Sequence, residues 1–541
     1  MDSAVQIDRA ASARGVVHVA REIPLTLLAL TLATSIEQWT GSGFSLLLTD
    51  LTGTLSASAD EASWTVTVYS LAFAVSVVLS HRLASYFGNR HLLTLSCALY
   101  AATSLGCAAS PSLGMFLVFR LLQGFAGGSF LARTLVFTTQ RLSKEQRVPM
   151  LRIYTIGFFT VGRLVAPVAA GWLADNVSWR VVFLVNIPVM LVAAWLFHRY
   201  APHHWHADIE KNPPDVLGIT LLLVGVAAAQ MVLSRGEIDD WFSSPLICAM
   251  AIAAITGNAL FILWQFLPIN RHPVLHLREL RDRGLFSAVI FGITLGMSLG
   301  GSLYVLPQYL RRVESHSALQ TGKLLAVGGV SAIAILLMLP TLVHLIGKFG
   351  SRLLMMIALG AQMLSMWMFA QILTPDTPDR SLWLPLLLNG VFMGIALPTV
   401  AMGALAGIAV PKVSNARAIY YGSRQLGATL GVAFAVILID RREALHSSRL
   451  LDTLYSRNLS IIGVAADSGD ALAMKKIAGA VLRQSAVLTF ADVFYAMAAL
   501  AAATLLLVPL LPALKPRQSQ PAVTHDTEPS PTGSGLQTAN I

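Results

Sequence analysis

The sequence predicts an all-α membrane protein with about fourteen transmembrane helices, and three observations support this prediction. Hydrophobic residues make up 55% of the 541 residues and charged residues only 12%, whereas soluble domains contain about 25% charged residues. The mean hydropathy is +0.66. The apolar residues form about fourteen runs of the length, roughly 20 residues, that a helix needs to cross a bilayer. This composition excludes a water-soluble enzyme.

The expected crossings follow one another from residue 23 to residue 514. They cover residues 23–48, 62–80, 92–110, 113–136, 150–174, 180–199, 215–234, 244–267, 285–308, 322–344, 353–373, 382–408, 418–440 and 489–514. The even number of crossings places both termini on the same side of the membrane. Apolar residues continue past Glu37 to Leu48, so the first run is interpreted as a full crossing and not as a cleaved signal peptide.

Lys and Arg residues indicate which side of the membrane holds the termini. They are concentrated in the loops on the terminal side, for example at Arg82, Arg90, Arg141 and Lys144. The positive-inside rule identifies that side as cytoplasmic. The net charge of +10 is therefore interpreted as a topology signal and not as a sign of nucleic-acid binding.

The chain also repeats itself in parallel orientation. The segment Phe87–Arg90 after the second crossing resembles Phe349–Arg352 after the tenth, and Gly162 resembles Gly422 in the same way, with about 260 residues between partners. Eight crossings separate the members of each pair, an even number that preserves orientation. The sequence therefore predicts two six-helix halves with two extra helices between them, an arrangement typical of transporters.

This organisation divides the chain into an arm, two halves, a central insert and a tail. The expected parts are a cytoplasmic arm at 1–22, an N-terminal six-helix half at 23–199, two extra transmembrane helices with cytoplasmic linkers at 200–284, a C-terminal six-helix half at 285–514 and a disordered cytoplasmic tail at 515–541. Residues 441–488, inside the C-terminal half, are expected to form an external, periplasmic loop with helical periodicity.

Charged residues inside the crossings are the sharpest functional signal. A charge near the middle of the bilayer costs at least roughly 2.5–3.5 kcal/mol, so it needs a partner or a polar cavity. Glu37 lies in the first crossing and Arg120 in the fourth. We interpret Glu37 as a proton acceptor that Arg120 holds in one state and releases in another, and the alternative is a static ion pair. Arg163 and Arg424 could neutralise anionic substrates or bind helix ends.

Two further sets of residues are candidates for a role in transport, with plain core packing as the alternative. Candidates for lining a substrate cavity are Gln38, Trp39, Thr40, Phe44, Trp64, Tyr69, Gln123, Arg163, Tyr304 and Arg424. Candidates for close and sliding helix contact are Gly124, Gly127, Gly128, Gly162, Pro167, Gly171, Gly427 and Gly431. The three cysteines show no metal-binding spacing, and no metal site is predicted.

Several local motifs together resemble the fourteen-helix drug:proton antiporter family of the major facilitator superfamily. They are Asp60–Trp64, Phe119–Gly124, Ala174–Asn176, Val185–Pro188, Pro307–Leu310, Arg424–Gly427, Gln484–Ala486 and Asp492–Phe494. The resemblance covers roughly residues 24–514. It implies the major facilitator fold and a role for Arg120 in proton coupling. It also implies similarity to inner-membrane pumps that work with a periplasmic adaptor and an outer-membrane channel.

The chain departs from this family at three places. The first crossing carries Thr40 where the family usually has Asp, and we expect Glu37 to take over its role. The gating loop after the second crossing keeps Gly88 and Arg90 but not the usual acidic residue, while Gly350 and Arg352 hold the matching places in the second half. In the fifth crossing Arg163 replaces an uncharged residue.

The resulting prediction is a proton-coupled secondary exporter of amphiphilic organic compounds or drugs across the bacterial inner membrane. Its expected partners are the lipid bilayer, protons, a small amphiphilic substrate, a periplasmic adaptor protein and an outer-membrane channel, with no nucleic acid. No cofactor is expected, because no phosphate-binding loop is present and the proton gradient supplies the energy. Proton-coupled uptake, export of a specialised metabolite or siderophore, and a non-transporting scaffold or sensor remain open alternatives.

Overall fold

The computed structural model describes residues 2–202, 205, 215–236, 239–270, 273, 275, 277–346, 350–374, 377–403, 413–457 and 471–510. This part of the chain consists of helices and short connections and contains no strand. The predicted tail at 515–541 lies outside it. The fold class is therefore all-α, as the sequence predicts.

The helices form an N-terminal group, a central pair and a C-terminal group. The N-terminal group contains α1 (Asp2–Leu55), α2 (Ala59–Ala109), α3 (Leu113–Gln140), α4 (Lys144–Phe159), η1 (Thr160–Val165), α5 (Ala166–Asn176), α6 (Trp179–Leu184) and α7 (Asn186–Tyr200). The central pair is α8 (Val216–Arg235) and α9 (Pro245–Phe266), with the short helices η2 (Trp241–Ser243) and η3 (Leu277–Arg281). The C-terminal group contains α10 (Arg283–Arg312), α11 (Ala318–Ile346), α12 (Gly350–Ile372), α13 (Asp379–Gly403), α14 (Val413–Arg457), α16 (Ala471–Leu507) and η6 (Val508–Leu510).

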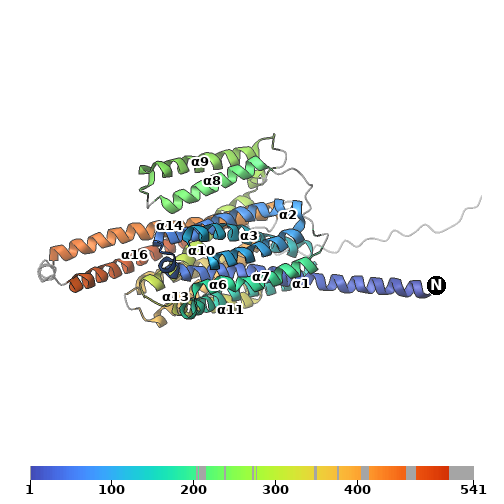
Figure 1. Cartoon of the computed structure of the whole chain (residues 1–541), viewed down its shortest axis with the longest axis horizontal. Helices are drawn as coiled ribbons and strands as arrows, with labels where there is room; N and C mark the ends of the chain where they lie inside the picture. Colours follow the sequence, from blue (N-terminus) through green and yellow to red (C-terminus); the bar gives the residue numbers. More distant parts are fainter. Residues whose placement is uncertain are drawn as a thin grey trace, which may run out of the picture.

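The long helices lie nearly side by side, and α8 and α9 pack on each other at the edge of the other helices (Figure 1). Eleven stretches among the described residues are long and apolar enough to cross a membrane, and Trp64–Val77 in α2 is a shorter apolar stretch. The chain is therefore a multi-pass membrane protein. The full count of fourteen crossings and the cytoplasmic position of the termini stay predictions.

A network around Asp215 fixes the start of α8. The carboxylate accepts hydrogen bonds from the backbone of Gly218 (2.8 Å), the indole of Trp264 (2.7 Å) and the amides of Gln265 (3.1 Å) and Asn270 (2.8 Å). One acidic side chain thereby caps α8 and binds it to the end of α9. This explains why two helices with little contact to the rest of the molecule stay paired.

The predicted connections after the second crossing and at 441–488 both contain helix. Within α2, two helices that contain the second and third crossings follow each other directly and meet at a kink at Gly88, whose backbone is not helical (φ 73°). Residues 441–457 continue α14, and residues 471–488 belong to α16, so the predicted loop 441–488 is largely two helical extensions. These extensions reach beyond the other helices at the end opposite the N-terminus (Figure 1). Hydropathy marks where a segment leaves the membrane, but not where its helix ends.

The fifth predicted crossing contains a turn of π-helix at η1, and its sequence gives the reason. Pro167 has no N–H with which to bond the carbonyl of Arg163 one turn earlier, so the regular helical pattern cannot continue there. The chain instead widens, and the N–H of Ala166 bonds to the carbonyl of Val161. Such π-turns inside helices are frequent at functional sites.

Two of the glycines paired by the internal repeat share an unusual conformation. Gly88 and Gly350 are the glycines with positive φ among the described residues, at 73° and 58°. Residues other than glycine rarely adopt this conformation. The repeat seen in the sequence is thus matched by the same backbone bend before α12 and within α2.

Candidate functional site

Glu37 is a buried carboxylate in the middle of α1, with 8% of its surface exposed. Its Oε2 accepts a hydrogen bond from the amide of Gln38 at 2.7 Å, and its Oε1 accepts one from the hydroxyl of Tyr69 at 3.3 Å. It has no ion-pair partner within 4.0 Å among the described residues. A buried carboxylate with hydrogen-bond donors but no cation in contact can exist with or without a proton, which is what a proton carrier requires.

Arg120 on α3 is more deeply buried than Glu37, with 2% exposed. Its guanidinium lies 4.2 Å from the ring centroid of Phe44 and 4.2 Å from that of Tyr69. It also donates to the side chain of Gln123 at 2.9 Å and to the carbonyl of Thr65 at 3.4 Å. Aromatic faces and neutral oxygens therefore hold this cation in place, and cation–π contacts of this kind contribute about 2 kcal/mol each when desolvated.

The expected direct pairing of Glu37 with Arg120 is absent from this structure, and Tyr69 takes part in both environments. Its hydroxyl binds the carboxylate while its ring contacts the guanidinium. Six residues that the sequence analysis selected thus form one cluster between α1, α2 and α3: Glu37, Gln38, Phe44, Tyr69, Arg120 and Gln123. Their role in proton coupling stays a prediction.

Arg424 on α14 brings the C-terminal group close to this cluster. Its charge and that of Arg120 both attract the Glu37 carboxylate, although neither forms an ion pair with it. The Nε atom of Arg424 is buried without a hydrogen-bond partner, and its guanidinium lies 5.8 Å from the ring of Tyr421. A small relative movement of the two helix groups would therefore change the field at Glu37.

The remaining aromatic and polar candidates near the first crossings have local structural roles. Trp39 is buried and donates to the carbonyl of Val182 at 3.0 Å, while Thr40 bonds to the carbonyl of Ile36 in its own helix. The ring of Trp64 lies 5.9 Å from the guanidinium of Arg235, at the end of α8. Tyr304 packs against apolar clusters of both helix groups. These contacts give Trp39, Trp64 and Tyr304 a packing role here.

A small cavity of about 50 Å³ lies between the N-terminal and C-terminal groups. Its polar lining comes from Ser42 and Ser45 of α1, Arg163 of η1, Ser302 of α10 and Asn389 of α13. Its apolar and small lining residues are Pro167, Leu303, Leu306, Pro307, Leu325, Gly328, Gly329, Leu386 and Met393. Of the ten predicted cavity residues, Arg163 is in this lining and the other nine are not. The packing candidate Pro167 is also in the lining, whereas the proton-coupling candidates Glu37 and Arg120 are not.

Side chains behind the cavity wall hold its polar groups. Gln362 of α12 donates to Ser302 Oγ at 2.7 Å, and its own side-chain oxygen accepts from Asn389 at 2.9 Å. Ser45 bonds to the carbonyl of Ser42 at 2.8 Å. The sequence analysis selected none of these residues for the cavity, because serine and amide side chains within an apolar helix give no signal that separates them from core residues.

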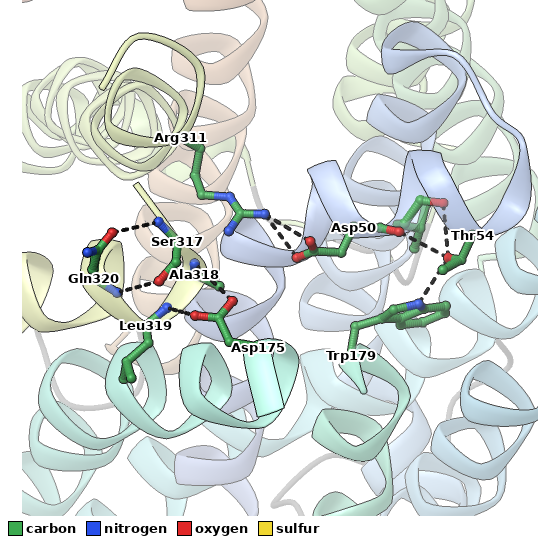
Figure 2. Close-up of polar contacts among 10 residues, drawn as sticks. Asp50, Thr54, Asp175, Trp179, Arg311, Ser317, Ala318, Leu319 and Gln320 are labelled. Carbon is green, nitrogen blue, oxygen red and sulfur yellow. Dashed lines mark hydrogen bonds and ion pairs between the residues drawn. The ribbon is translucent and has the colours of Figure 1, made fainter. Parts of the chain in front are cut away.

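Two polar contacts join the helix groups at the end where α1 and α5 stop and α11 begins. Arg311 of α10 forms an ion pair with Asp50 of α1, at 3.0 Å to each carboxylate oxygen. Asp175 of α5 accepts the backbone N–H groups of Ala318 (3.2 Å) and Leu319 (2.8 Å), the first residues of α11. Figure 2 shows both contacts next to each other. We call these two contacts the inter-group clamp.

The predicted packing glycines lie where helices touch. An added Cβ at Gly124 would overlap the carbonyl of Tyr69, and those at Gly427 and Gly431 would overlap carbonyls of α10. At Gly162 it would meet Gln38, and at Gly171 it would overlap Ala318 across the two groups. At Gly128 an added Cβ would overlap the carbonyl of Phe73 on α2, and at Gly127 it would closely approach the side chains of Tyr69 and Tyr100. Closely packed helices at these points leave no room for larger side chains.

The predicted gating residues lie at the ends of helices. Arg90 follows the bend at Gly88 and donates to the carbonyl of His198 on α7. Arg352 follows Gly350 in the first turn of α12. The bend thus places an arginine after each of the two repeated glycines, but their role in gating stays a prediction.

The family model of the Major Facilitator Superfamily matches residues 30–432. The chain belongs to this superfamily. Solved transporter structures share its fold, for example a D-xylose–proton symporter with a TM-score of 0.59 at 14% identity, covering 91% of this chain and 98% of the other. An auto-inhibited POT family peptide transporter is similar, with a TM-score of 0.59 at 14% identity and 92% and 98% coverage.

Several curated relatives are named as resistance or export proteins. The fatty acid resistance protein FarB of Neisseria gonorrhoeae is 29% identical and covers 76% of this chain and 80% of its own length. The probable multidrug resistance protein EmrY of Escherichia coli is 25% identical with 80% and 83% coverage, and the colistin resistance protein EmrB of Acinetobacter baumannii is 25% identical with 76% and 79% coverage. These relatives support the resemblance to the drug:proton antiporter family, and family and fold indicate a transporter rather than an enzyme.

Proposed function

We propose that this protein is a proton-coupled secondary exporter of amphiphilic organic compounds across the bacterial inner membrane, working by alternating access. The observation that carries the proposal is the buried Glu37 carboxylate, which is held by Gln38 and Tyr69 and contacts no cation in the described part of the chain. The cavity between the helix groups supplies the substrate site. The names of the relatives, which refer to resistance and export, support the outward direction.

The clamp and the proton site together describe a transport cycle. In the observed state Asp50–Arg311 and Asp175–α11 hold the two groups together at one end, which we assign to the periplasmic side. Substrate would enter from the cytoplasmic side, and the clamp would open to release it. A proton arriving at Glu37 would remove its attraction to Arg424 and Arg120 and so change the relative stability of the two states.

The proposed topology has fourteen crossings with cytoplasmic termini. The helices α1 and α13 and the apolar part of α2 at Trp64–Val77 would add three crossings to the eleven recognised ones. The helical extensions of α14 and α16 would then reach into the periplasm, where an adaptor protein could bind before passing substrate to an outer-membrane channel. The proton gradient would supply the energy without a further cofactor.

The test is transport by the purified protein in proteoliposomes with an imposed pH gradient. Wild-type protein should move a fluorescent amphiphile against its gradient, and a protonophore should stop this movement. Glu37→Gln should bind the dye but lose proton-driven transport, whereas Glu37→Asp should keep part of it. Full proton-driven transport by Glu37→Gln would refute the assignment of this residue.

A further inference from the structure

Arg163 is a cation that lines the small cavity and has no partner in the described part of the chain. Its side chain is partly buried. It forms no ion pair and donates no hydrogen bond there, so it does not bind a helix end, which the sequence left as one alternative. None of the residues that line the cavity is acidic. The charge of Arg163 is therefore not balanced by any of the lining residues.

Three acidic residues on the helices that form the cavity do not balance this charge either. Asp50 is paired with Arg311, and Asp175 accepts the N–H groups of the first turn of α11. Glu37 lies outside the cavity lining. A guanidinium that is taken out of water without a counter-ion is unfavourable. A small anion in the cavity would remove this cost.

The size of the cavity limits which anion can bind. The cavity measures about 50 Å³, and a water molecule needs roughly 10–15 Å³ of such space. An organic amphiphile therefore does not fit while the groups are in the observed position, and it would need them to separate. A chloride ion is close to a water molecule in size and does fit.

Two neutral side chains of the lining offer further hydrogen-bond donors. The hydroxyl of Ser42 makes no hydrogen bond to any described residue. Asn389 gives one of its two amide N–H groups to Gln362, at 2.9 Å, and keeps the other. The hydroxyls of Ser45 and Ser302 are engaged, because each donates to a backbone carbonyl. The cavity thus presents a cation, two free donors and no carboxylate, which is a set that suits a small anion.

These donors come from both helix groups. Ser42 belongs to α1 and Arg163 to η1, whereas Asn389 belongs to α13 of the C-terminal group. The backbone of Arg163 is held at the contact between the groups, because its carbonyl faces Gly329 of α11, where an added Cβ would overlap it. An anion bound to all three side chains would join the groups, and it would lose part of its contacts when they separate.

We infer that the cavity is a binding site for one small monovalent inorganic anion, such as chloride, held by Arg163, Ser42 and Asn389 while the two groups are in contact. The guanidinium would balance its charge, and the hydroxyl and the amide would donate hydrogen bonds to it. A ligand that binds one state better shifts the equilibrium toward that state, so the anion would favour the clamped state. This site goes beyond the proposed function, because the anion would bind whether or not the protein exports an amphiphile.

The experiment measures the line width of the chloride nuclear magnetic resonance signal with the full chain in lipid nanodiscs, and empty nanodiscs give the background. Gluconate replaces chloride at constant ionic strength, so that screening stays the same. The wild type should broaden the chloride line in a saturable way, and sulfate, which is larger and divalent, should not displace the bound chloride. Arg163→Gln should lower the chloride affinity by at least about tenfold, since hydrogen bonds to charged groups are the strong ones. Arg163→Lys should retain part of the affinity.

Two matched controls separate the site from general effects of charge and shape. Arg152→Gln removes the same charge from the same predicted crossing outside the cavity lining, where the side chain donates to the carbonyl of Leu337, and it should bind chloride like the wild type. Ser42→Ala should lower the chloride affinity by about threefold or more. Ser45→Ala, one turn along the same helix, should keep the wild-type affinity, because its hydroxyl already donates to the carbonyl of Ser42.

Thermal unfolding gives a second readout. In gluconate Arg163→Gln should melt at or above the wild-type temperature, because the variant has no unpaired buried charge. Replacing gluconate with chloride should raise the melting temperature of the wild type but not that of Arg163→Gln, since a ligand that binds only the folded protein stabilises it. Absence of saturable broadening in the wild type, unchanged chloride affinity in Arg163→Gln, or equal losses in Ser42→Ala and Ser45→Ala would overturn the inference.

Discussion

The clamp at the end of α5 and α11 leads to a quantitative prediction for Asp175→Asn. In the structure the Asp175 carboxylate accepts two backbone N–H groups, those of Ala318 and Leu319. These groups belong to the free N–H groups at the start of a helix, where a negative charge is also favourable. The variant keeps one side-chain oxygen as an acceptor, so it loses the charge and one of the two hydrogen bonds.

The size of the effect follows from these two losses. A hydrogen bond to a charged group contributes about 1.5–3 kcal/mol, and a charge at a helix N-terminus about 0.3–1 kcal/mol. Asp175 is exposed to solvent, so both contributions should be near their lower limits. We expect the clamped state to lose about 1.5–2 kcal/mol relative to the unclamped one. The ratio of the two populations should fall by roughly tenfold to thirtyfold.

The assay is pulsed electron paramagnetic resonance on the full chain in nanodiscs. Spin labels on Val177→Cys and Arg380→Cys report the distance between the groups, because both residues are exposed near this end of the molecule. Cys97 and Cys107 are buried and can stay, whereas Cys248 is half-buried and is changed to Ser. Asp175→Asn should increase the population with the longer distance.

The control is Asn176→Ala, because Asn176 donates to the carbonyl of Trp172 in its own helix and makes no contact between the groups. It should give the wild-type distance distribution. Asp50→Asn should act in the same direction as Asp175→Asn, and the double variant should show nearly the sum of the two effects. Identical distributions in wild type and Asp175→Asn would show that this contact does not hold the groups together.

Three other predictions concern the proton site, the central pair and the helical extensions. Tyr69→Phe keeps the ring over Arg120 but removes the hydroxyl that binds Glu37. The pH dependence of transport should therefore change, while the melting temperature should not. Tyr69→Ala removes the ring as well and should lower both transport activity and melting temperature. Burial alone would raise the pKa of Asp215, but its hydrogen bonds with Trp264, Gly218, Asn270 and Gln265 hold that pKa below the ordinary value. Its stabilising effect is therefore complete at neutral pH and is lost as the pH falls through its folded pKa, so Asp215→Asn should lower the melting temperature at pH 7, with the difference from wild type closing below about pH 4. Replacing Leu450, Leu451 and Leu454 with Ser should abolish whole-cell resistance but not transport in liposomes, because Leu451 is 42% exposed on the extension of α14 and an adaptor would cover it. Arg449→Ser is the control variant. Equal losses in both assays would show that these leucines stabilise the fold and do not bind a partner.

Most of the fold follows from the order of apolar residues. The predicted crossing at 244–267 is α9 (Pro245–Phe266), and that at 353–373 ends within one residue of the end of α12 (Gly350–Ile372), because hydropathy marks the ends of a helix that stops at the membrane surface. Hydropathy alone does not show that a helix continues past its apolar part, as α14 does, and here the helical periodicity of the polar residues predicted the continuation. A polar sequence such as 441–457 can remain helical when it packs on a neighbour, and Ser485 of α16 bonds to the carbonyl of Glu443 there.

The candidate site was predictable in its charges but not in its pairings. Glu37, Arg120 and Arg163 stand out because a charge within an apolar run is costly. The sequence does not show that Tyr69 contacts both Glu37 and Arg120. It also does not show that Arg163 lines the cavity. The pairing of Asp50 with Arg311 depends on contact between helices that are far apart in the chain, and no local pattern encodes that contact. Aromatic type alone does not determine which neighbour Trp64 faces, and its ring lies near Arg235 of α8 in this structure.

The position of three features on one helix gives a physical reason for coupling between them. Glu37 of the proton site, Ser42 and Ser45 of the cavity and Asp50 of the clamp all belong to α1. Thirteen residues of α-helix span about 20 Å at 1.5 Å per residue, and hydrogen bonds along the helix make such a segment move as one body. A shift of α1 that follows a change of charge at Glu37 would therefore move the cavity wall and the Asp50 carboxylate together. Contact with Arg311 requires a separation of about 3 Å, so a displacement of α1 by only a few ångströms is enough to open one half of the clamp.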